Sequence, residues 1–230
     1  MCEESSPVEI KGAAIATSEE ARRSHAKLLV NIWDEKYVLH PSWWKGPYDI
    51  SPVLQRVTTG ADVLDVGCGT GRYLVALDRT GFRAVGADLS REALALLDPR
   101  YPRVVSDVQQ LPFRDRSFDA VTCYGLLGHL AGRARTRGAA ELFRVLRDQG
   151  LAFVEVLGRR DMRYGQGVKI TADTFIRGGI PHHHFSPREL CELFQSAGFA
   201  VQALDEKVNH KRYKGAEHTR HRIVMVAEKL

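Results

Sequence analysis

The chain has 230 residues, of which 44% are hydrophobic and 27% charged, a balance typical of one globular domain with modest additions. Its formal net charge of +5 permits an anionic partner such as RNA but does not require one. The four cysteines are widely spaced and form no CxxC pair, and no apolar run approaches the ~20 residues of a membrane-spanning helix. We therefore expect a cytoplasmic protein without a disulfide framework, metal site or membrane segment.

The first 50 residues predict a helix followed by an aromatic loop. Within Ser18–Tyr37, apolar side chains recur at helical spacing, and Ser18, Glu19 and Glu20 suit a helix N-terminus. The next segment reads HPSWWKGPYDISP, and its prolines and glycine exclude a regular helix or a central strand.

From residue 61 onward, short apolar runs alternate with amphipathic helices, which favours a doubly wound α/β fold. Counting two late strands, we expect a seven-stranded, mainly parallel sheet with helices on both faces. The expected strands are Ala61–Val66, Arg83–Asp88, Val104–Asp107, Phe118–Tyr124, Leu151–Leu157, Phe199–Leu204 and Arg222–Glu228. The expected helices are Gly71–Asp78, Ser90–Leu97, Thr136–Arg147 and a capped helix from Ser186 to about Ala197, with an irregular stretch over 158–185 before it.

A glycine-rich turn, VLDVGCGTG at 63–71, joins the first expected strand to a helix. A dinucleotide-binding turn would place a third small residue where this chain has Arg72, and a phosphate-binding P-loop would need a GKS or GKT sequence. The carboxylate of Asp65 precedes the turn and would repel a phosphate. The turn therefore suits a ligand that carries an amine and no phosphate.

Two further carboxylates follow at the ends of the next two expected strands. Asp88 can accept hydrogen bonds from both hydroxyls of a ribose. Asp107 can accept one from the exocyclic amine of adenine. With Asp65, they would lie along one edge of the sheet.

In these motifs the chain resembles the class I S-adenosylmethionine-dependent methyltransferases of the methyltransferase domain 11/25 type, over roughly residues 55–157. The turn VLDVGCGTG is similar to their glycine motif, GADLS to their ribose-binding motif, SDVQQLPF to their adenine-binding motif and FDAVTCYGLLGHL to their fourth motif. FRVLRDQG resembles a turn that commonly contains Pro-Gly in the family, where this chain has Asp148-Gln149. The resemblance implies a Rossmann-like fold and S-adenosyl-L-methionine as cofactor.

The resemblance also implies roles for individual residues. Asp65 would lie beside the methionine amine, Asp88 would hold the ribose diol, and Asp107 and the amide of Val108 would meet the adenine. The expected cofactor-binding residues are Asp65, Gly67, Cys68, Gly69, Asp88, Leu89, Asp107, Val108 and Tyr124.

Methyl transfer from a sulfonium depends mainly on positioning and exclusion of water, so a catalytic side chain is optional. His129 follows the fourth expected strand and is the candidate general base; alternatively it orients its loop or caps the next helix. Within 1–50, family resemblance suggests a lid over the cofactor. Candidate substrate residues are Trp43, Trp44 and Tyr48, which could instead anchor the N-terminal helix, and His183.

Residues 51–230 are expected to form the methyltransferase domain, with a substrate-facing insertion at about 158–186. Its Arg159, Arg160, Arg163 and Lys169 suit an anionic acceptor, or only solubility. His182 and His184 would face the same way in an extended segment, but no third ligand stands at a diagnostic spacing, so no metal is predicted.

The predicted function is methyl transfer to an N, O or C atom of a small-molecule acceptor. A tRNA-modifying methyltransferase is one alternative, because LPFRDRSFDAV and RVLRDQG also resemble tRNA wobble-uridine methyltransferases and residues 209–222 are basic. A non-catalytic, cofactor-binding partner module is the other. Oligomeric state stays open.

Overall fold

The computed structural model describes residues 30, 32–41, 49–213 and 215–230. Residues 32–39 form the described part of the N-terminal helix predicted over Ser18–Tyr37. The predicted lid residues Trp43, Trp44 and Tyr48 lie outside the described residues.

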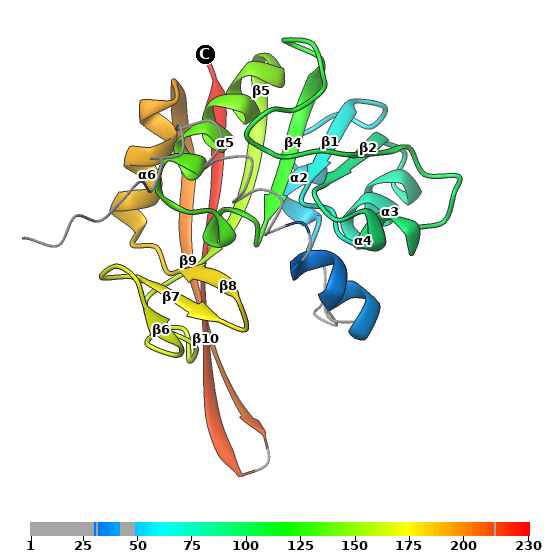
Figure 1. Cartoon of the computed structure of the whole chain (residues 1–230). Coiled ribbons are helices and arrows are strands. Elements are labelled where there is room, and N and C mark those ends of the chain that lie inside the picture. The colour runs from blue at the N-terminus through cyan, green and yellow to red at the C-terminus, as the bar shows by residue number, and fades with distance from the viewer. Residues whose placement is uncertain (1–29, 31, 42–48, 214) are drawn as a thin grey trace, which may run out of the picture.

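A seven-stranded sheet in the order β3-β2-β1-β4-β5-β10-β9 forms the centre of the fold (Figure 1). The pairs β3–β2, β2–β1, β1–β4 and β4–β5 are parallel, whereas β10 is antiparallel to both β5 and β9. The predicted doubly wound, mainly parallel sheet is therefore confirmed. Its strands are β1 Asp62–Val66, β2 Arg83–Asp88, β3 Arg103–Val105, β4 Phe118–Tyr124, β5 Leu146–Leu157, β9 Phe199–Tyr213 and β10 Ala216–Lys229.

Helices cover both faces of this sheet, because alternate strand residues are apolar on each side. Leu64 of β1 packs in a cluster with side chains of α5 and α6, whereas its neighbour Val63 packs with side chains of α2 and α3. The helices are α2 Ser51–Leu54, α3 Arg72–Arg79, α4 Arg91–Ala95, the 3-10 turn η1 Leu127–His129, α5 Gly132–Val145 and α6 Pro187–Ser196. In α6 the Ser186 hydroxyl accepts from the Glu189 amide, as the sequence predicts.

Several predicted boundaries are wrong. β3 ends at Val105, so Asp107 lies in the loop after it. β5 begins at Leu146 rather than Leu151, because Leu146 already pairs with Phe118 and the chain then bulges before pairing resumes. α5 correspondingly spans Gly132–Val145 and not Thr136–Arg147.

The hairpin of β9 and β10 is much longer than predicted, and it projects beyond the rest of the sheet (Figure 1). Its outer part pairs Val208 with His221 and His210 with Thr219. In this part of the hairpin, apolar and polar side chains do not alternate, so the sequence lacks the period-2 pattern of a half-buried strand. Backbone pairing across the hairpin forms the strands there.

The stretch over 158–185 was expected to be irregular, and the structure corrects this. It holds a second antiparallel sheet of β6 Val168–Lys169, β7 Thr174–Arg177 and β8 Ile180–His183. The turn between β7 and β8 is Gly178-Gly179, with φ values of 56° and 78°. A Gly-Gly pair with two positive φ angles is a favoured hairpin turn, and it was the signal that could have predicted these strands.

Candidate active site

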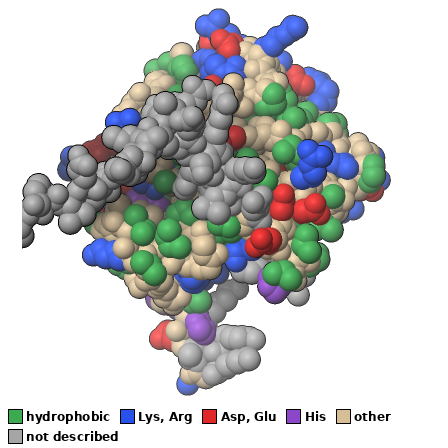
Figure 2. Space-filling model, in the orientation of Figure 1, with side chains coloured by type: hydrophobic (Ala, Val, Ile, Leu, Met, Phe, Trp, Pro, Cys, Tyr) green, Lys and Arg blue, Asp and Glu red, His purple; other side chains and the backbone are tan. Residues whose placement is uncertain are grey.

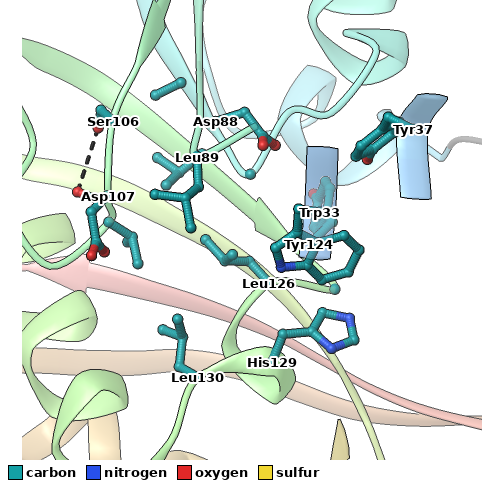
Figure 3. A pocket seen from close by; sticks show the side chains of 15 residues that line it. Trp33, Tyr37, Asp88, Leu89, Ser106, Asp107, Tyr124, Leu126, His129 and Leu130 are labelled. Atoms are coloured by element: carbon teal, nitrogen blue, oxygen red, sulfur yellow. Dashed lines mark hydrogen bonds between the residues drawn. The ribbon is translucent and has the colours of Figure 1, made fainter. Parts of the chain in front are cut away.

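A cleft lies where β1, β2 and β4 end, beneath the helix of residues 32–39 (Figure 3). This is the edge of an open α/β sheet at which ligands generally bind. We call it the cofactor cleft. It is lined by Trp33, Tyr37, Val66, Gly67, Ala87, Asp88, Leu89, Ser106, Asp107, Val108, Tyr124, Gly125, Leu126, His129 and Leu130.

The glycine turn is held against β2 by backbone hydrogen bonds. The amides of Gly67 and Cys68 donate to the Ala87 carbonyl at 2.7 and 3.2 Å. Gly69 has a φ of 53°, and a Cβ there would lie 2.6 Å from the Tyr37 hydroxyl. The positive φ favours glycine at 69, and any side chain there would also displace the Tyr37 ring.

Asp88 fastens the turn to the start of α4. Its Oδ2 accepts from the Gly69 amide at 2.7 Å and its Oδ1 from the Ser90 amide at 2.8 Å. Burial raises the pKa of this carboxyl, opposed by those amide hydrogen bonds. A carboxylate offers about four lone-pair positions, so Asp88 keeps acceptor capacity toward the cleft that it lines.

Asp65 has a buried acceptor without a donor. The carboxyl is 3% exposed, and its Oδ1 accepts from the Thr122 hydroxyl at 2.8 Å. Its Oδ2 has no hydrogen-bond partner. Burial raises the pKa of Asp65 to about 7, with a further contribution from the charge of Asp88. Asp65 is not among the residues that line the cleft, and a cationic or N–H donor that reached its side chain would satisfy the free oxygen.

The other predicted cofactor residues divide into two groups. Leu89, Asp107, Val108 and Tyr124 line the cleft, as expected from their positions. Cys68 does not, because its side chain packs under β2, where a Cβ on Gly86 would lie 2.8 Å from its sulfur. Only the backbone of Cys68 belongs to the turn.

The helix of residues 32–39 supplies two cleft residues that the sequence analysis did not assign. Trp33 and Tyr37 both line the cleft (Figure 3). Asp34 of the same helix accepts from the Ser90 hydroxyl at 2.6 Å and from the Glu92 amide at 3.2 Å. These bonds attach the helix to the N-terminus of α4. The helical spacing of Trp33 and Tyr37 was visible in the sequence, but their target was not.

His129 also lines the cleft and lies near the Trp33 indole (Figure 3). Its Nδ1 is 2.9 Å from the Pro181 carbonyl oxygen, and its ring centroid is 5.1 Å from that of Trp33 and 4.9 Å from that of His182. Burial lowers the pKa of His129 to about 4. The ring is therefore neutral near pH 7. Because a carbonyl only accepts, Nδ1 carries the proton and Nε2 keeps a lone pair.

A second cavity of about 570 Å³ adjoins the cleft, and we call it the acceptor chamber. Trp33, Gly125 and His129 line both spaces. The remaining walls come from β5, β8, β10 and the insertion. Lys36 and the insertion turn also meet here, since a Cβ on Gly178 would lie 3.3 Å from Lys36 Nζ.

His183 borders the chamber, but both of its ring nitrogens are engaged within the protein. Nδ1 lies 2.8 Å from the Thr174 hydroxyl, and Nε2 lies 2.7 Å from Glu189 Oε1. This favours a structural role over the predicted substrate contact. His182 is the histidine that reaches His129, and its buried Nδ1 has no hydrogen-bond partner. No three potential metal ligands gather anywhere in the described part of the chain.

Of the four basic residues proposed from the sequence for an anionic acceptor, only Arg163 lines the chamber. Arg159 pairs with Asp173 and Arg160 with Glu206, and Lys169 is exposed. The structure adds three chamber residues that the sequence analysis missed: Arg177, Arg220 and Arg222. Arg220 and Arg222 are two residues apart and therefore lie on one face of β10; the expected strand began at Arg222, so the sequence did not place Arg220 on it.

None of the helices in the described ranges is long and apolar enough to cross a membrane. The fold and the cleft together define a class: Rossmann-like α/β proteins that bind a ligand at the carboxyl ends of parallel strands. Residues 64–154 match the model of a family described as "Methyltransferase domain". Over these residues the chain is similar to S-adenosylmethionine-dependent methyltransferases, as the names of its curated relatives and the resemblance of its motifs also indicate.

Two curated relatives are named as probable S-adenosylmethionine-dependent methyltransferases. The protein of Mycolicibacterium smegmatis is 30% identical over 169 residues, which cover 70% of this chain and 61% of the relative. The protein of Mycobacterium tuberculosis is 31% identical over 160 residues, covering 66% of this chain and 54% of the relative. This chain thus spans between half and two thirds of the length of these relatives.

A solved structure of similar fold is the Burkholderia thailandensis 1,6-didemethyltoxoflavin-N1-methyltransferase with bound substrate and S-adenosylhomocysteine. The TM-score is 0.69 at 22% identity, covering 97% of this chain and 93% of that one. At this identity the likeness concerns the fold.

Proposed function

We propose that this protein transfers a methyl group from S-adenosylmethionine to an N, O or C atom of a small-molecule acceptor in the acceptor chamber. The main support for this proposal is that the cofactor cleft and the acceptor chamber adjoin: Trp33, Gly125 and His129 line both. A donor held in the cleft and an acceptor held in the chamber meet beside one histidine ring.

The cleft suits this cofactor by its donor and acceptor chemistry. The free Oδ2 of Asp65 offers a partner for the ammonium of the methionine part, directly or through water. Asp88 retains lone pairs for the ribose hydroxyls. Asp107 and the amide of Val108 are proposed to meet the adenine. Cys68 would contribute only its backbone groups to the cofactor site.

When bound, the cofactor supplies an activated methyl group on a sulfonium. The chain's own residues then orient the acceptor and exclude water. Trp33 and Tyr37 cover the cleft, and Trp43, Trp44 and Tyr48 remain proposed lid residues. The Nε2 lone pair of His129 is proposed to take the proton from the acceptor's nucleophilic atom, while Pro181 holds Nδ1–H in place.

The test combines cofactor binding with methyl transfer. Calorimetric titration with S-adenosylmethionine should give saturable binding that Asp88→Asn weakens and the exposed control Asp78→Asn leaves unchanged. Incubation with labelled cofactor and fractionated cell extract, with and without nuclease treatment, should label a small molecule in both samples. Binding without transfer to any fraction would favour the non-catalytic module instead.

The tRNA alternative rests on the basic segment at residues 209–222. On the face seen in Figure 2, Lys and Arg side chains are interspersed with Asp and Glu over the main body and form no continuous basic band. A nuclease-sensitive labelled product would nonetheless replace the small-molecule proposal by the tRNA alternative. The cytoplasmic location stays a prediction from the sequence.

A further inference from the structure

The acceptor chamber holds more guanidinium groups than carboxylates. Among the described residues, its walls include Arg163, Arg177, Arg220 and Arg222 but a single acid, Glu155. Asp161 lies beside them, with its side chain fully buried. In the described part of the chain, four guanidinium groups of the chamber therefore face two carboxylates.

Asp161 holds two of the arginines at once. Its Oδ1 accepts from Arg163 Nε at 2.7 Å, and its Oδ2 accepts from Arg220 Nε at 3.1 Å. The amide of His221 also donates to Oδ2, at 3.2 Å. Burial acts to raise the pKa of Asp161, but the hydrogen bonds and charges of the arginines outweigh it and lower the pKa to about 2. Asp161 thus positions Arg163 and Arg220, and both of its carboxylate oxygens already accept hydrogen bonds within the protein.

The positive charges of Arg177 and Arg222 are less closely paired with carboxylates. Arg222 lies 3.5 Å from Glu155, at the long end for an ion pair. Arg177 donates to the neutral Gln166 Oε1 at 3.1 Å and has no ion-pair partner among the described residues. Burial lowers the pKa of Arg177, and the charge of Arg163 adds to this. The charge of Asp161 opposes this shift only in part. Partly buried cations with incomplete compensation are costly, and a bound anion reduces that cost.

On this basis we propose that the acceptor is a small molecule with an oxyanionic group, a carboxylate or a phosphate, that the arginines of the chamber bind. This rests on the proposed function. Planar guanidinium groups match both oxyanions in a bidentate manner. The arginines line the chamber together with His129 and His182, so the anion would be held in the chamber while the nucleophilic atom points toward the cleft.

The binding test needs no knowledge of the acceptor. Inorganic phosphate and acetate are each titrated into the full chain at constant ionic strength, with chloride as reference, in the presence of S-adenosylhomocysteine. Saturable binding of at least one oxyanion is expected. Arg177→Gln should weaken it by about tenfold or more. Arg159→Gln removes a charge from the same insertion outside the chamber, and it should leave binding unchanged.

Arg177 is chosen because its removal leaves no buried carboxylate unpaired, so the variant should fold. Its affinity for S-adenosylhomocysteine, measured alongside, should equal that of the original chain. Equal loss of oxyanion binding in the Arg177→Gln and Arg159→Gln variants, or no binding that exceeds the chloride reference, would overturn the inference.

The transfer test separates this inference from the proposed function. Labelled products from the extract are passed over an anion-exchange resin, and retention of the label is expected because the acceptor keeps its charged group. Label found only in neutral or nuclease-sensitive material would overturn the inference. Oxyanion binding without transfer to any fraction would instead contradict the proposed function and leave the anion site standing.

Discussion

The Nδ1 of His129 lies 2.9 Å from the carbonyl oxygen of Pro181. This contact joins the loop after β4 to strand β8 of the insertion, so the part of the chain that shapes the acceptor chamber also orients the candidate base. Such a bond selects one tautomer and one ring orientation.

Replacing His129 by Ala should therefore slow methyl transfer while leaving cofactor affinity within about a factor of two. The expected loss is about 100-fold or more, the usual contribution of a positioned general base. Single-turnover transfer and calorimetric titration of the cofactor would measure the two effects. His210→Ala on the exposed hairpin is the matched control. Full activity of His129→Ala would leave the histidine with only a structural role.

Asp65 should make unfolding pH-dependent in the protein without cofactor. Its pKa is raised to about 7 in the folded state, from an ordinary value of 3.8. Between these values the folded chain binds more protons than the unfolded chain, so the contribution of Asp65 to stability falls as pH rises. Denaturant unfolding at pH 5 and pH 8 measures this. Asp65→Asn should flatten the dependence, whereas Asp78→Asn should not.

Cofactor affinity should change with pH in the opposite sense. If the Asp65 carboxylate receives the cofactor ammonium, binding favours the ionised form, and affinity should rise as pH increases through about 7. Affinity that is flat in the original chain from pH 6 to pH 8 would argue against this pairing.

Asp88→Asn should raise the dissociation constant for S-adenosylmethionine about tenfold or more, because hydrogen bonds to a charged acceptor are lost both at the turn and at the ligand. Calorimetry measures the change. The thermal midpoint should also fall, since the Gly69 and Ser90 amides lose their charged partner. An unaltered dissociation constant would remove Asp88 from the cofactor site.

Asp34 and Ser90 should be coupled energetically, because their 2.6 Å hydrogen bond attaches the N-terminal helix to α4. Asp34→Ala is expected to speed cofactor release, as Trp33 and Tyr37 lose their attachment. A double-mutant cycle with Ser90→Ala should give a coupling of about 0.5–1.5 kcal/mol in cofactor binding. Strict additivity of the two substitutions would show that the helix is held by other contacts.

The sequence by itself determined the parallel part of the sheet and most of the cofactor cleft. β1, β2 and β4 are short, largely apolar runs; the turn with Gly67 and Gly69 follows β1, and Asp88 is the last residue of β2. Such local signals suffice because parallel strands end at one edge of the sheet, so residues at their carboxyl ends converge without further information.

Only the tertiary structure decided the acceptor side. Arg177 lies on β7, and Arg220 and Arg222 lie on β10; they reach one chamber because the insertion folds against the hairpin. The contact of His129 with Pro181 and the saturation of Asp161 depend on the same packing. Arg177 is more than 40 residues away from Arg220 in the sequence, and Arg220 lies in the polar outer part of the hairpin, which has no apolar alternation. No local pattern could therefore have shown that their charges meet.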